Sequence, residues 1–271
     1  MRPSPPALFV MAALALAGGI GVVATRHAEG ASDDGPALPS DAATFGFVVR
    51  GHASGVALLE STKPFSLALA NGPVHGVPPT SARLATASAI VSRELARYPV
   101  AFLRGVRLAG IVLTEDLAEN EMPIPSLPNV GGLLLLDVSS VESDLVRSLH
   151  HEIFHFFDLA DDGRVSPDAA WEALNPPGFV YGSGGRTLRG TWAAHPSDDL
   201  PGFVSVYATS GVEEDKADTF AFALTRAPLV RARMTSNAVL RAKIEELTRR
   251  VTALDAAAAQ RLGLDALLAA R

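Results

Sequence analysis

The 271-residue sequence contains no cysteine. This absence excludes disulfide bonds, a thiolate nucleophile, a cysteine-ligated metal and a lipidated cysteine anchor. Basic residues are also few, because 23 Lys and Arg stand against 29 Asp and Glu, and no segment carries a run of them. The net charge of -6 therefore gives no electrostatic basis for a nucleic-acid partner. Hydrophobic residues make up 48% of the chain, which is enough for one sizeable core.

One long hydrophobic run is present, at the N-terminus. Arg2 is followed by an uncharged apolar stretch from Ala7 to Ala24 and then by a polar segment. We interpret residues 1–30 as a signal peptide or an N-terminal membrane anchor, because roughly 18 uncharged residues also approach the length of a spanning helix. A cleaved signal and an anchor through residues 7–24 both stay open. Either one predicts an exported protein that is secreted, periplasmic or anchored.

Residues 31–43 are rich in Asp, Ser, Pro and Ala without periodicity, which predicts a linker ahead of one domain over residues 44–271. The stretch 45–80 has no dominant pattern after its first strand, because glycines interrupt it. The remaining pattern predicts strands at Phe45–Gly51, Val106–Thr114 and Gly131–Val138, the last two joined by a Pro-rich loop, and helices at Ser81–Tyr98, from near Glu213, and at Ser236–Leu254.

A further helix is expected directly after the strand Gly131–Val138. Ser139 and Glu142 match a capping box, which predicts a helix from there to about Leu159. Its apolar stripe consists of Leu145, Leu149, Ile153 and Phe156. His151 and His155 fall on a different face, which we expect to border a cleft.

The two histidines belong to the pattern H-E-x-x-H in SLHHEIFHFFD. Histidines four residues apart on a helix point the same way, so both imidazoles can reach one tetrahedral ion. Glu152 lies to the side, where it can hold a water and act as a general base. His151 and His155 are therefore candidate zinc ligands, and Glu152 is a candidate catalytic residue.

A catalytic zinc needs a third protein ligand, for which the sequence offers four candidates. Asp161 lies six residues after His155, but the required turn lacks its glycine, and Asp158 sits further along the same helix. His195 is chemically suitable and lies in a polar loop. Glu214 is the preferred candidate, because Asp218 one turn later can accept a hydrogen bond from a ligand histidine.

Three segments together resemble a known family: HEIFHFFD, WEALNPPGFVYG and GFVSVYATSGVEEDKADTFA. They are similar to bacterial zinc-binding metallopeptidases of the gluzincin class, and the resemblance covers about residues 106–230. A tyrosine placed similarly ahead of the ligand glutamate occurs in anthrax lethal factor and the Pro-Pro endopeptidases. The family's second glutamate is replaced here by Asp218.

The resemblance implies zinc ligands His151, His155 and Glu214, with Glu152 as the general base. It places Tyr207 where the family's tyrosine supports the oxyanion. Trp171, Asn175, Pro176 and Tyr181 match the second segment and belong either to loop structure or to a substrate cleft. The implied fold is α+β and zincin-like, with a small, mostly antiparallel sheet over an active-site helix and a mainly helical C-terminal lobe.

We therefore expect an exported zinc metalloendopeptidase that acts on a protein or peptide substrate. The strand near Leu133–Asp137 is expected to bind extended substrate along an exposed edge. Two alternatives stay open. One is a non-catalytic, zinc-stabilised binding domain of the same fold, and the other is a toxin-type protease acting on another cell's protein.

Overall fold

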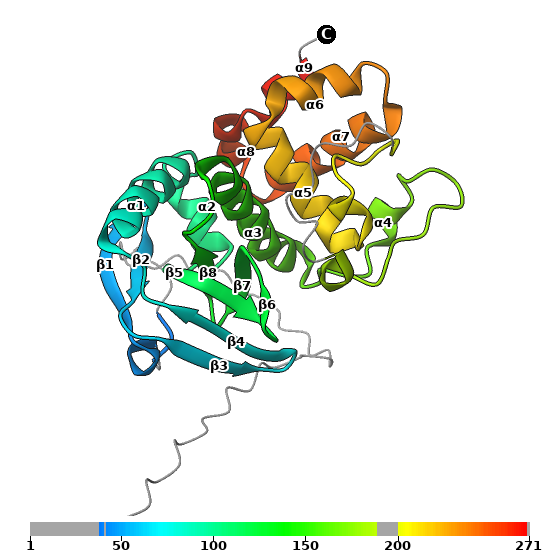
Figure 1. Ribbon diagram of the computed structural model, residues 1–271. Coiled ribbons are helices and arrows are strands. Elements are labelled where there is room, and N and C mark those ends of the chain that lie inside the picture. Colours follow the sequence, from blue (N-terminus) through cyan, green and yellow to red (C-terminus); the bar gives the residue numbers. More distant parts are fainter. Residues whose placement is uncertain (1–37, 41, 189–199, 270–271) are drawn as a thin grey trace, which may run out of the picture.

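The computed structural model describes residues 38–40, 42–188 and 200–269. Within these ranges the chain is α+β, with a mixed sheet in the N-terminal half and helices in the C-terminal half (Figure 1). The strands are β1 (Phe47–Ala53), β2 (Val56–Ser61), β3 (Phe65–Leu69), β4 (Gly72–Val77), β5 (Gly110–Glu119), β6 (Met122–Pro123), β7 (Ser126–Val130) and β8 (Leu133–Asp137). The α-helices are α1 (Ser81–Leu95), α2 (Val100–Gly105), α3 (Glu142–Asp162), α4 (Ala169–Glu172), α5 (Val212–Thr225), α6 (Ala227–Met234), α7 (Ala238–Leu254), α8 (Ala256–Leu262) and α9 (Leu264–Ala269). Short 3-10 helices are η1 (Ala42–Phe45), η2 (Gly185–Leu188) and η3 (Tyr207–Thr209).

The sheet is mixed, with most of its pairings antiparallel as expected, and it has eight strands among the described residues. The first half of β5 pairs in parallel with β2 on one side and with β8 on the other. The other pairings are antiparallel and join β1 to β2, β3 to β4, β4 to β5, β5 to β6, and β7 to β8. The expectation of a small sheet is wrong, because it counted three strands where the described chain forms eight.

Most of the additional strands lie in residues 47–77, where the sequence pattern was interrupted by glycine. These residues form β1 to β4, two antiparallel hairpins. The turn between β1 and β2 requires a left-handed backbone, which Ser54 (φ 50°) and Gly55 (φ 80°) supply. Glycine here marks a turn between strands: the strand before it was predicted at Phe45–Gly51, whereas β2 after it was not.

Strand β8 is not at the edge of the sheet, which corrects the expected substrate-binding edge. It pairs with β5 on one side and β7 on the other, and all five of its residues are buried. Leu134 and Leu136 enter the core on the helix side, whereas Leu133 and Leu135 enter a second cluster on the opposite face. An apolar run that is continuous on both faces is typical of such a central strand.

The edge beside β8 is formed by β7, which lies inside the expected Pro-rich loop. β7 pairs antiparallel with β8, with a bulge between Leu127 and Val130. Proline lacks an N–H donor and is tolerated in edge strands, so Pro128 does not prevent this strand from forming. The prolines obscured a strand that depends on tertiary contacts, namely its pairing with β8 and its packing against α3.

Helix α3 begins at Glu142 and ends at Gly163, which adopts the left-handed conformation (φ 77°) that often terminates helices. The predicted capping box is wrong: Val141 precedes the first turn without a side-chain cap. Ser139 instead donates hydrogen bonds from both its N–H and its hydroxyl to Asp137. The expected apolar stripe is buried, with exposed fractions of 3% or less at Leu145, Leu149, Ile153 and Phe156.

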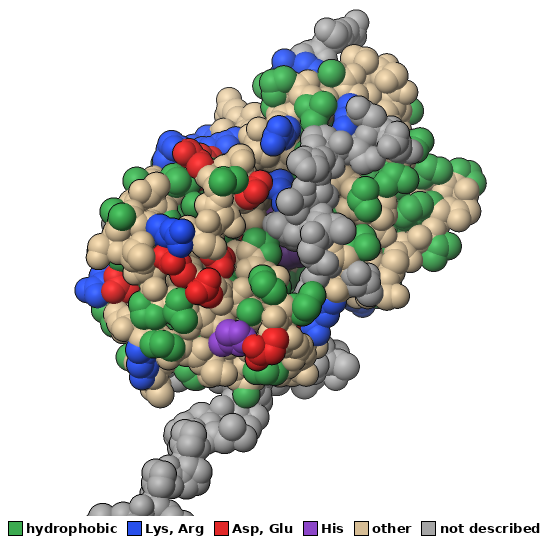
Figure 2. All heavy atoms as spheres, viewed as in Figure 1, with side chains coloured by type: hydrophobic (Ala, Val, Ile, Leu, Met, Phe, Trp, Pro, Cys, Tyr) green, Lys and Arg blue, Asp and Glu red, His purple; other side chains and the backbone are tan. Residues whose placement is uncertain are grey.

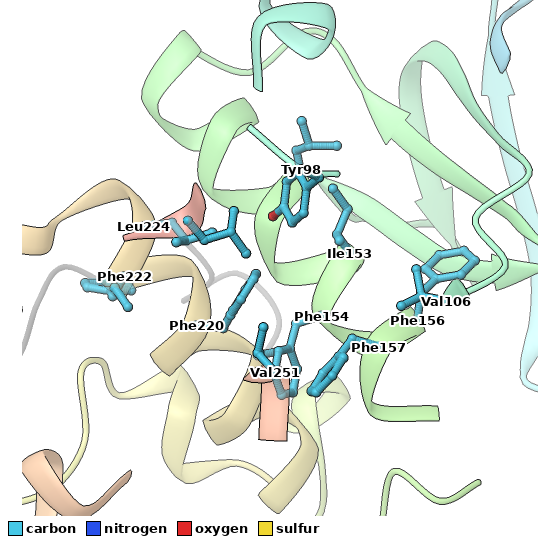
Figure 3. Packing of buried hydrophobic residues seen from close by; sticks show 14 of the residues in the cluster. Tyr98, Val106, Ile153, Phe154, Phe156, Phe157, Phe220, Phe222, Leu224 and Val251 are labelled. Atoms are coloured by element: carbon cyan, nitrogen blue, oxygen red, sulfur yellow. The ribbon is translucent and has the colours of Figure 1, made fainter. Parts of the chain in front are cut away.

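The main hydrophobic core joins the sheet, α3 and the C-terminal helices. Figure 3 shows Phe154 and Phe157 of α3 close to Phe220 of α5 and Val251 of α7. The ring centroids of Phe154 and Phe220 are 5.2 Å apart. This packing holds α3 and α5 side by side, and it therefore sets the distance between the functional groups that each helix carries.

Residues 212–269 are helical throughout, apart from short connections, in agreement with the expected C-terminal lobe. Across the described ranges, no helix combines the length and the hydrophobicity needed to cross a membrane. Residues 7–24, on which the anchor prediction depends, lie outside the described residues. Lys and Arg side chains are scattered among Asp and Glu on the face shown in Figure 2.

Candidate metal centre

Helix α3 brings the two histidines together over one helical turn. His151 and His155 are 1% and 8% exposed, and their Nε2 atoms are 3.1 Å apart. Their rings are nearly perpendicular, at 75°, with centroids 4.8 Å apart. Two imidazole nitrogens are therefore directed at one point on the surface of the helix.

Glu214, in the first turn of α5, supplies a carboxylate at the same point. Its Oε2 lies 3.0 Å from Nε2 of His151 and 3.7 Å from Nε2 of His155. Among the described residues, His151, His155 and Glu214 are the group whose ligand atoms come close enough to share a metal ion. His151 and Glu214 are 63 residues apart in the sequence, and the packing of α3 against α5 brings them together.

The donor set fits a tetrahedral zinc ion. Metal–ligand distances of about 2.0–2.1 Å place tetrahedral ligand atoms roughly 3.3 Å from one another. The observed separations of 3.0, 3.1 and 3.7 Å lie around this value. Two imidazoles and one carboxylate are also the ligands of a common class of catalytic zinc site, which keeps a fourth position open.

Asp218 contacts the far side of the His151 ring, the type of contact expected from its spacing. Its Oδ1 lies 3.1 Å from Nδ1 of His151 and accepts a second hydrogen bond from Arg147, at 3.2 Å. Burial opposes the ionisation of Asp218, but the hydrogen bond from His151 and the charge of Arg147 hold its pKa below the usual value. An ionised Asp218 only accepts hydrogen bonds, so Nδ1 of His151 carries a proton and Nε2 presents its lone pair to the metal position.

Without a cation, three acceptor atoms would face one another at this position. Burial disfavours a charged His151, yet its hydrogen bonds with Asp218 and Glu214 outweigh burial and raise its pKa to about 10. Burial acts against the ionised form of Glu214 as well, and hydrogen bonds with His151 and His155 nevertheless hold its pKa well below the ordinary value. The site therefore favours a positive charge among these three groups, which a proton or a metal ion can supply.

Glu152 lies beside this cluster and is 4% exposed. Its Oε1 accepts a hydrogen bond of 2.6 Å from the hydroxyl of Ser126 in β7. Its Oε2 is buried and has no hydrogen-bond partner within the described part of the chain. A buried carboxylate oxygen without a partner is costly, so this atom is suited to a ligand or water in the adjoining cavity.

Tyr207 reaches the cluster from η3, directly before α5. Its ring centroid is 5.9 Å from that of His151. Burial, together with the charge of Glu214, raises the pKa of Tyr207, so its hydroxyl stays protonated. The segment is held in place by Ser205, whose hydroxyl donates to Asp218 Oδ2 and accepts the N–H of Ala208 at 3.0 Å.

Gly185 passes directly over Tyr207 and Glu214. A Cβ at this position would lie 2.2 Å from the hydroxyl oxygen of Tyr207 and 2.3 Å from Oε1 of Glu214. Gly184, one residue earlier, has φ 91° and donates its N–H to Ser210 O at 2.7 Å. Glycine is therefore required here because the backbone approaches two functional side chains closely.

The cluster opens into a cavity of about 450 Å³. One wall is the edge of the sheet at residues 123–129, and the opposite wall is the segment 183–186. His151, Glu152, His155, Tyr207 and Glu214 all line it. The expectation that the histidines border a cleft is confirmed by this lining.

The other candidates for the third ligand do not reach the cluster. Asp158 is bound by Lys216, with Oδ1 and Nζ 2.7 Å apart. Asp161 is exposed, and its nearest ion-pair partner is Arg250 at 3.9 Å. His195 lies outside the described residues.

The residues of the segment WEALNPPGFVYG surround Asp215 rather than the metal position. Asp215 Oδ2 accepts hydrogen bonds from Trp171 Nε1 at 2.8 Å and from the hydroxyl of Tyr181 at 2.6 Å. Lys243 donates to the same oxygen at 2.6 Å, and Asn175 donates to the Tyr181 hydroxyl at 2.8 Å. Trp171 therefore has a structural contact and lies buried in the short helix α4, whereas Asn175 and Tyr181 also line a second cavity of about 530 Å³.

Four residues of the site were missed by the sequence analysis: Ser126, Arg147, Gly185 and Ser205. Arg147 lies one turn before His151 on α3, so helical spacing could have indicated it. Ser126 lies in a short edge strand, Gly185 begins the 3-10 helix η2 and Ser205 lies in a loop, so no periodicity relates these three to the H-E-x-x-H helix.

No protein-family model and no curated protein sequence matches the chain. Among solved structures, it is similar to the crystal structure of "a putative zinc-binding metallo-peptidase from Bacteroides caccae". The two share 17% sequence identity, the match covers 70% of this chain and 81% of that chain, and the TM-score is 0.46. At this level of similarity, the function must be inferred from the geometry of the site itself.

Proposed function

We propose that the protein is an exported zinc-dependent metalloendopeptidase. The observation that carries the proposal is the convergence of His151, His155 and Glu214 beside a buried glutamate in a cavity. This arrangement combines three zinc ligands with a general base, which is what hydrolysis of a peptide bond by an activated water requires. Export is supported by the apolar stretch at residues 7–24.

In this proposal each residue has a defined task. A zinc ion held by the two histidines and Glu214 would polarise the scissile carbonyl and make an attacking water more acidic. Glu152 takes the proton from the water through its free oxygen and delivers it to the leaving amine. The protonated hydroxyl of Tyr207 donates a hydrogen bond to the oxygen that becomes negatively charged. Asp218 fixes the tautomer of His151.

Extended peptide substrate would bind along the outer edge of β7. The sequence had indicated β8 as the substrate-binding strand, but β8 is paired on both sides, whereas β7 borders the cavity. An edge strand offers main-chain donors and acceptors to a peptide without regard to its side chains. The proposed substrate class is therefore an unfolded or extended segment of a protein.

The test is a comparison of wild type with Glu152→Gln. Purified protein is expected to contain one equivalent of zinc by elemental mass spectrometry and to cleave members of a peptide library, with hydroxamates inhibiting the cleavage. The variant is expected to keep its zinc and lose at least about 100-fold in kcat, because general-base catalysis contributes roughly 100- to 10,000-fold. Cleavage by the variant at the wild-type rate would refute the assignment of the base. Bound zinc without any turnover in wild type would instead favour the zinc-stabilised binding domain.

A further inference from the structure

We propose that Ser126 is a positioning residue for Glu152: its hydroxyl holds one carboxylate oxygen so that the other stays available for proton transfer. This inference rests on the proposed function, because it assigns a task within the same reaction. It concerns a residue on the sheet edge, outside the H-E-x-x-H helix and the second ligand helix.

The contact is short and buried. Ser126 Oγ lies 2.6 Å from Glu152 Oε1, and the two residues are 7% and 4% exposed. A hydroxyl that donates to a carboxylate forms a charge-assisted hydrogen bond, which is stronger than one between neutral groups. In the described part of the chain Oε2 has no such partner. The two oxygens of Glu152 are therefore chemically distinct, because one accepts a hydrogen bond from the protein and the other has no protein partner in the described part of the chain, in a residue that lines the cavity.

The hydroxyl is presented by a rigid part of the sheet. Pro125, directly before Ser126, accepts the N–H of Asp137 at 2.9 Å, and its ring restricts the backbone. Asp137 is itself held, because its carboxylate accepts the N–H groups of Leu117 at 2.9 Å and of Ser139 at 2.7 Å. Ser126 therefore cannot follow Glu152 if the carboxylate rotates, and the hydrogen bond selects one orientation of Glu152.

This link also relates the base to the substrate. Ser126 belongs to β7, the strand that lines the cavity and that the proposed function assigns to peptide binding. Ser126, which orients Glu152, would then also belong to the strand that sets the register of the bound peptide. The distance between the scissile bond and the free carboxylate oxygen would then be defined by one short strand rather than by two independent elements.

The chain offers a matched control in Ser148. It lies on α3 four residues before Glu152 and is 1% exposed, and its hydroxyl has no hydrogen-bond partner in the described ranges. Replacing Ser126 or Ser148 by Ala removes the same buried atom, but only the first change removes a hydrogen bond to Glu152. Any general cost of losing a buried hydroxyl should appear in both variants.

The experiment measures peptide hydrolysis and a carboxylate vibration in the full-length wild type, Ser126→Ala and Ser148→Ala. We expect kcat of Ser126→Ala to fall about 10- to 100-fold, as for loss of a hydrogen bond to a charged group, with KM and zinc content close to wild type. Ser148→Ala should keep the wild-type kcat. Equal values of kcat in the two variants would overturn the proposal.

The second measurement does not depend on turnover. In metal-free protein, the infrared difference between wild type and Glu152→Gln isolates the carboxylate stretch of Glu152. This band should shift when Ser126 is replaced by Ala and should stay in place in Ser148→Ala. An unshifted band would show that Ser126 does not hold Glu152. A shifted band in a protein that cleaves no peptide would leave the contact standing and refute the proposed function instead.

Discussion

Replacing Asp218 by Asn tests whether a buried carboxylate on α5 prepares His151 for a metal ion. Asn keeps the shape of the side chain but removes its charge. It weakens the hydrogen bond that Asp218 accepts from His151 Nδ1 at 3.1 Å and removes the charge with which Arg147 forms a buried ion pair at 3.2 Å. The hydrogen bond that stabilises the His151 tautomer with a lone pair on Nε2 is then weaker.

The size of the effect follows from the two contacts. Removing a group that orients a ligand histidine costs about 10- to 100-fold in metal affinity, or about 1.4–2.7 kcal/mol of binding free energy. Loss of the buried, charge-assisted hydrogen bond that Arg147 donates to Asp218 should lower the free energy of unfolding by a further 1.5–3 kcal/mol, approximately. The variant should therefore bind zinc more weakly and also unfold more easily.

Asp215→Asn separates these two effects. Asp215 is on the same helix and is fully buried like Asp218, but it pairs with Lys243 and contacts neither histidine. Both variants should lose stability in urea unfolding of the metal-free protein. Only Asp218→Asn should weaken zinc binding in competition with a chromophoric chelator. Wild-type zinc affinity in Asp218→Asn, or an equal loss of affinity in both variants, would refute the reasoning.

Two further predictions concern close packing and pH. Gly185→Ala should reduce zinc affinity or kcat, because its Cβ would lie 2.2 Å from the Tyr207 hydroxyl and 2.3 Å from Glu214. Gly105→Ala is the control, because a Cβ there meets nothing within 4 Å, and it should leave zinc affinity and kcat unchanged. Equal effects of the two variants in zinc titration and peptide kinetics would contradict the close packing at Gly185. Glu94 has a pKa lowered from 4.5 to about 2, chiefly by its hydrogen bond with His150 and further by Arg97 and Arg93. The stability that it contributes is present above about pH 4.5 and is lost as the pH falls to about 2, so Glu94→Gln should cost up to about 3 kcal/mol in urea unfolding at pH 7 and almost nothing near pH 2. A cost that does not change with pH would show that the charge of Glu94 is not involved.

Helix α3 could be predicted because its signals are local. The apolar stripe from Leu145 to Phe156 and the four-residue spacing of the histidines both follow from the helical period. The start of that helix could not be predicted from Ser139, since Asp137 competes for its hydroxyl and its N–H. A capping residue is available to its helix only when no nearby acceptor binds it more closely.

The sheet was harder to predict, because strand pairing joins segments that are distant in sequence. Residues 47–77 form four strands between glycine turns, and β7 forms in a stretch that contains proline. Regular alternation of buried and exposed residues is limited to short strands such as β3. The predicted edge strand was also wrong: the apolar run of β8 is typical of a central strand, but β7, the strand that covers its outer side, lies in a stretch that contains proline.

The sequence alone determined which chemical groups were available. With no cysteine present, a metal site had to use histidine and carboxylate, and the helical period directed His151 and His155 to the same side. Tertiary structure decided which carboxylate joins them, which oxygen of Glu152 is left free, and which strand borders the cavity. The physical reason is distance along the chain: side chains one helical turn apart are positioned by local backbone geometry, whereas Glu214 and Ser126 reach the site only through the packing of α5 and β7 against α3.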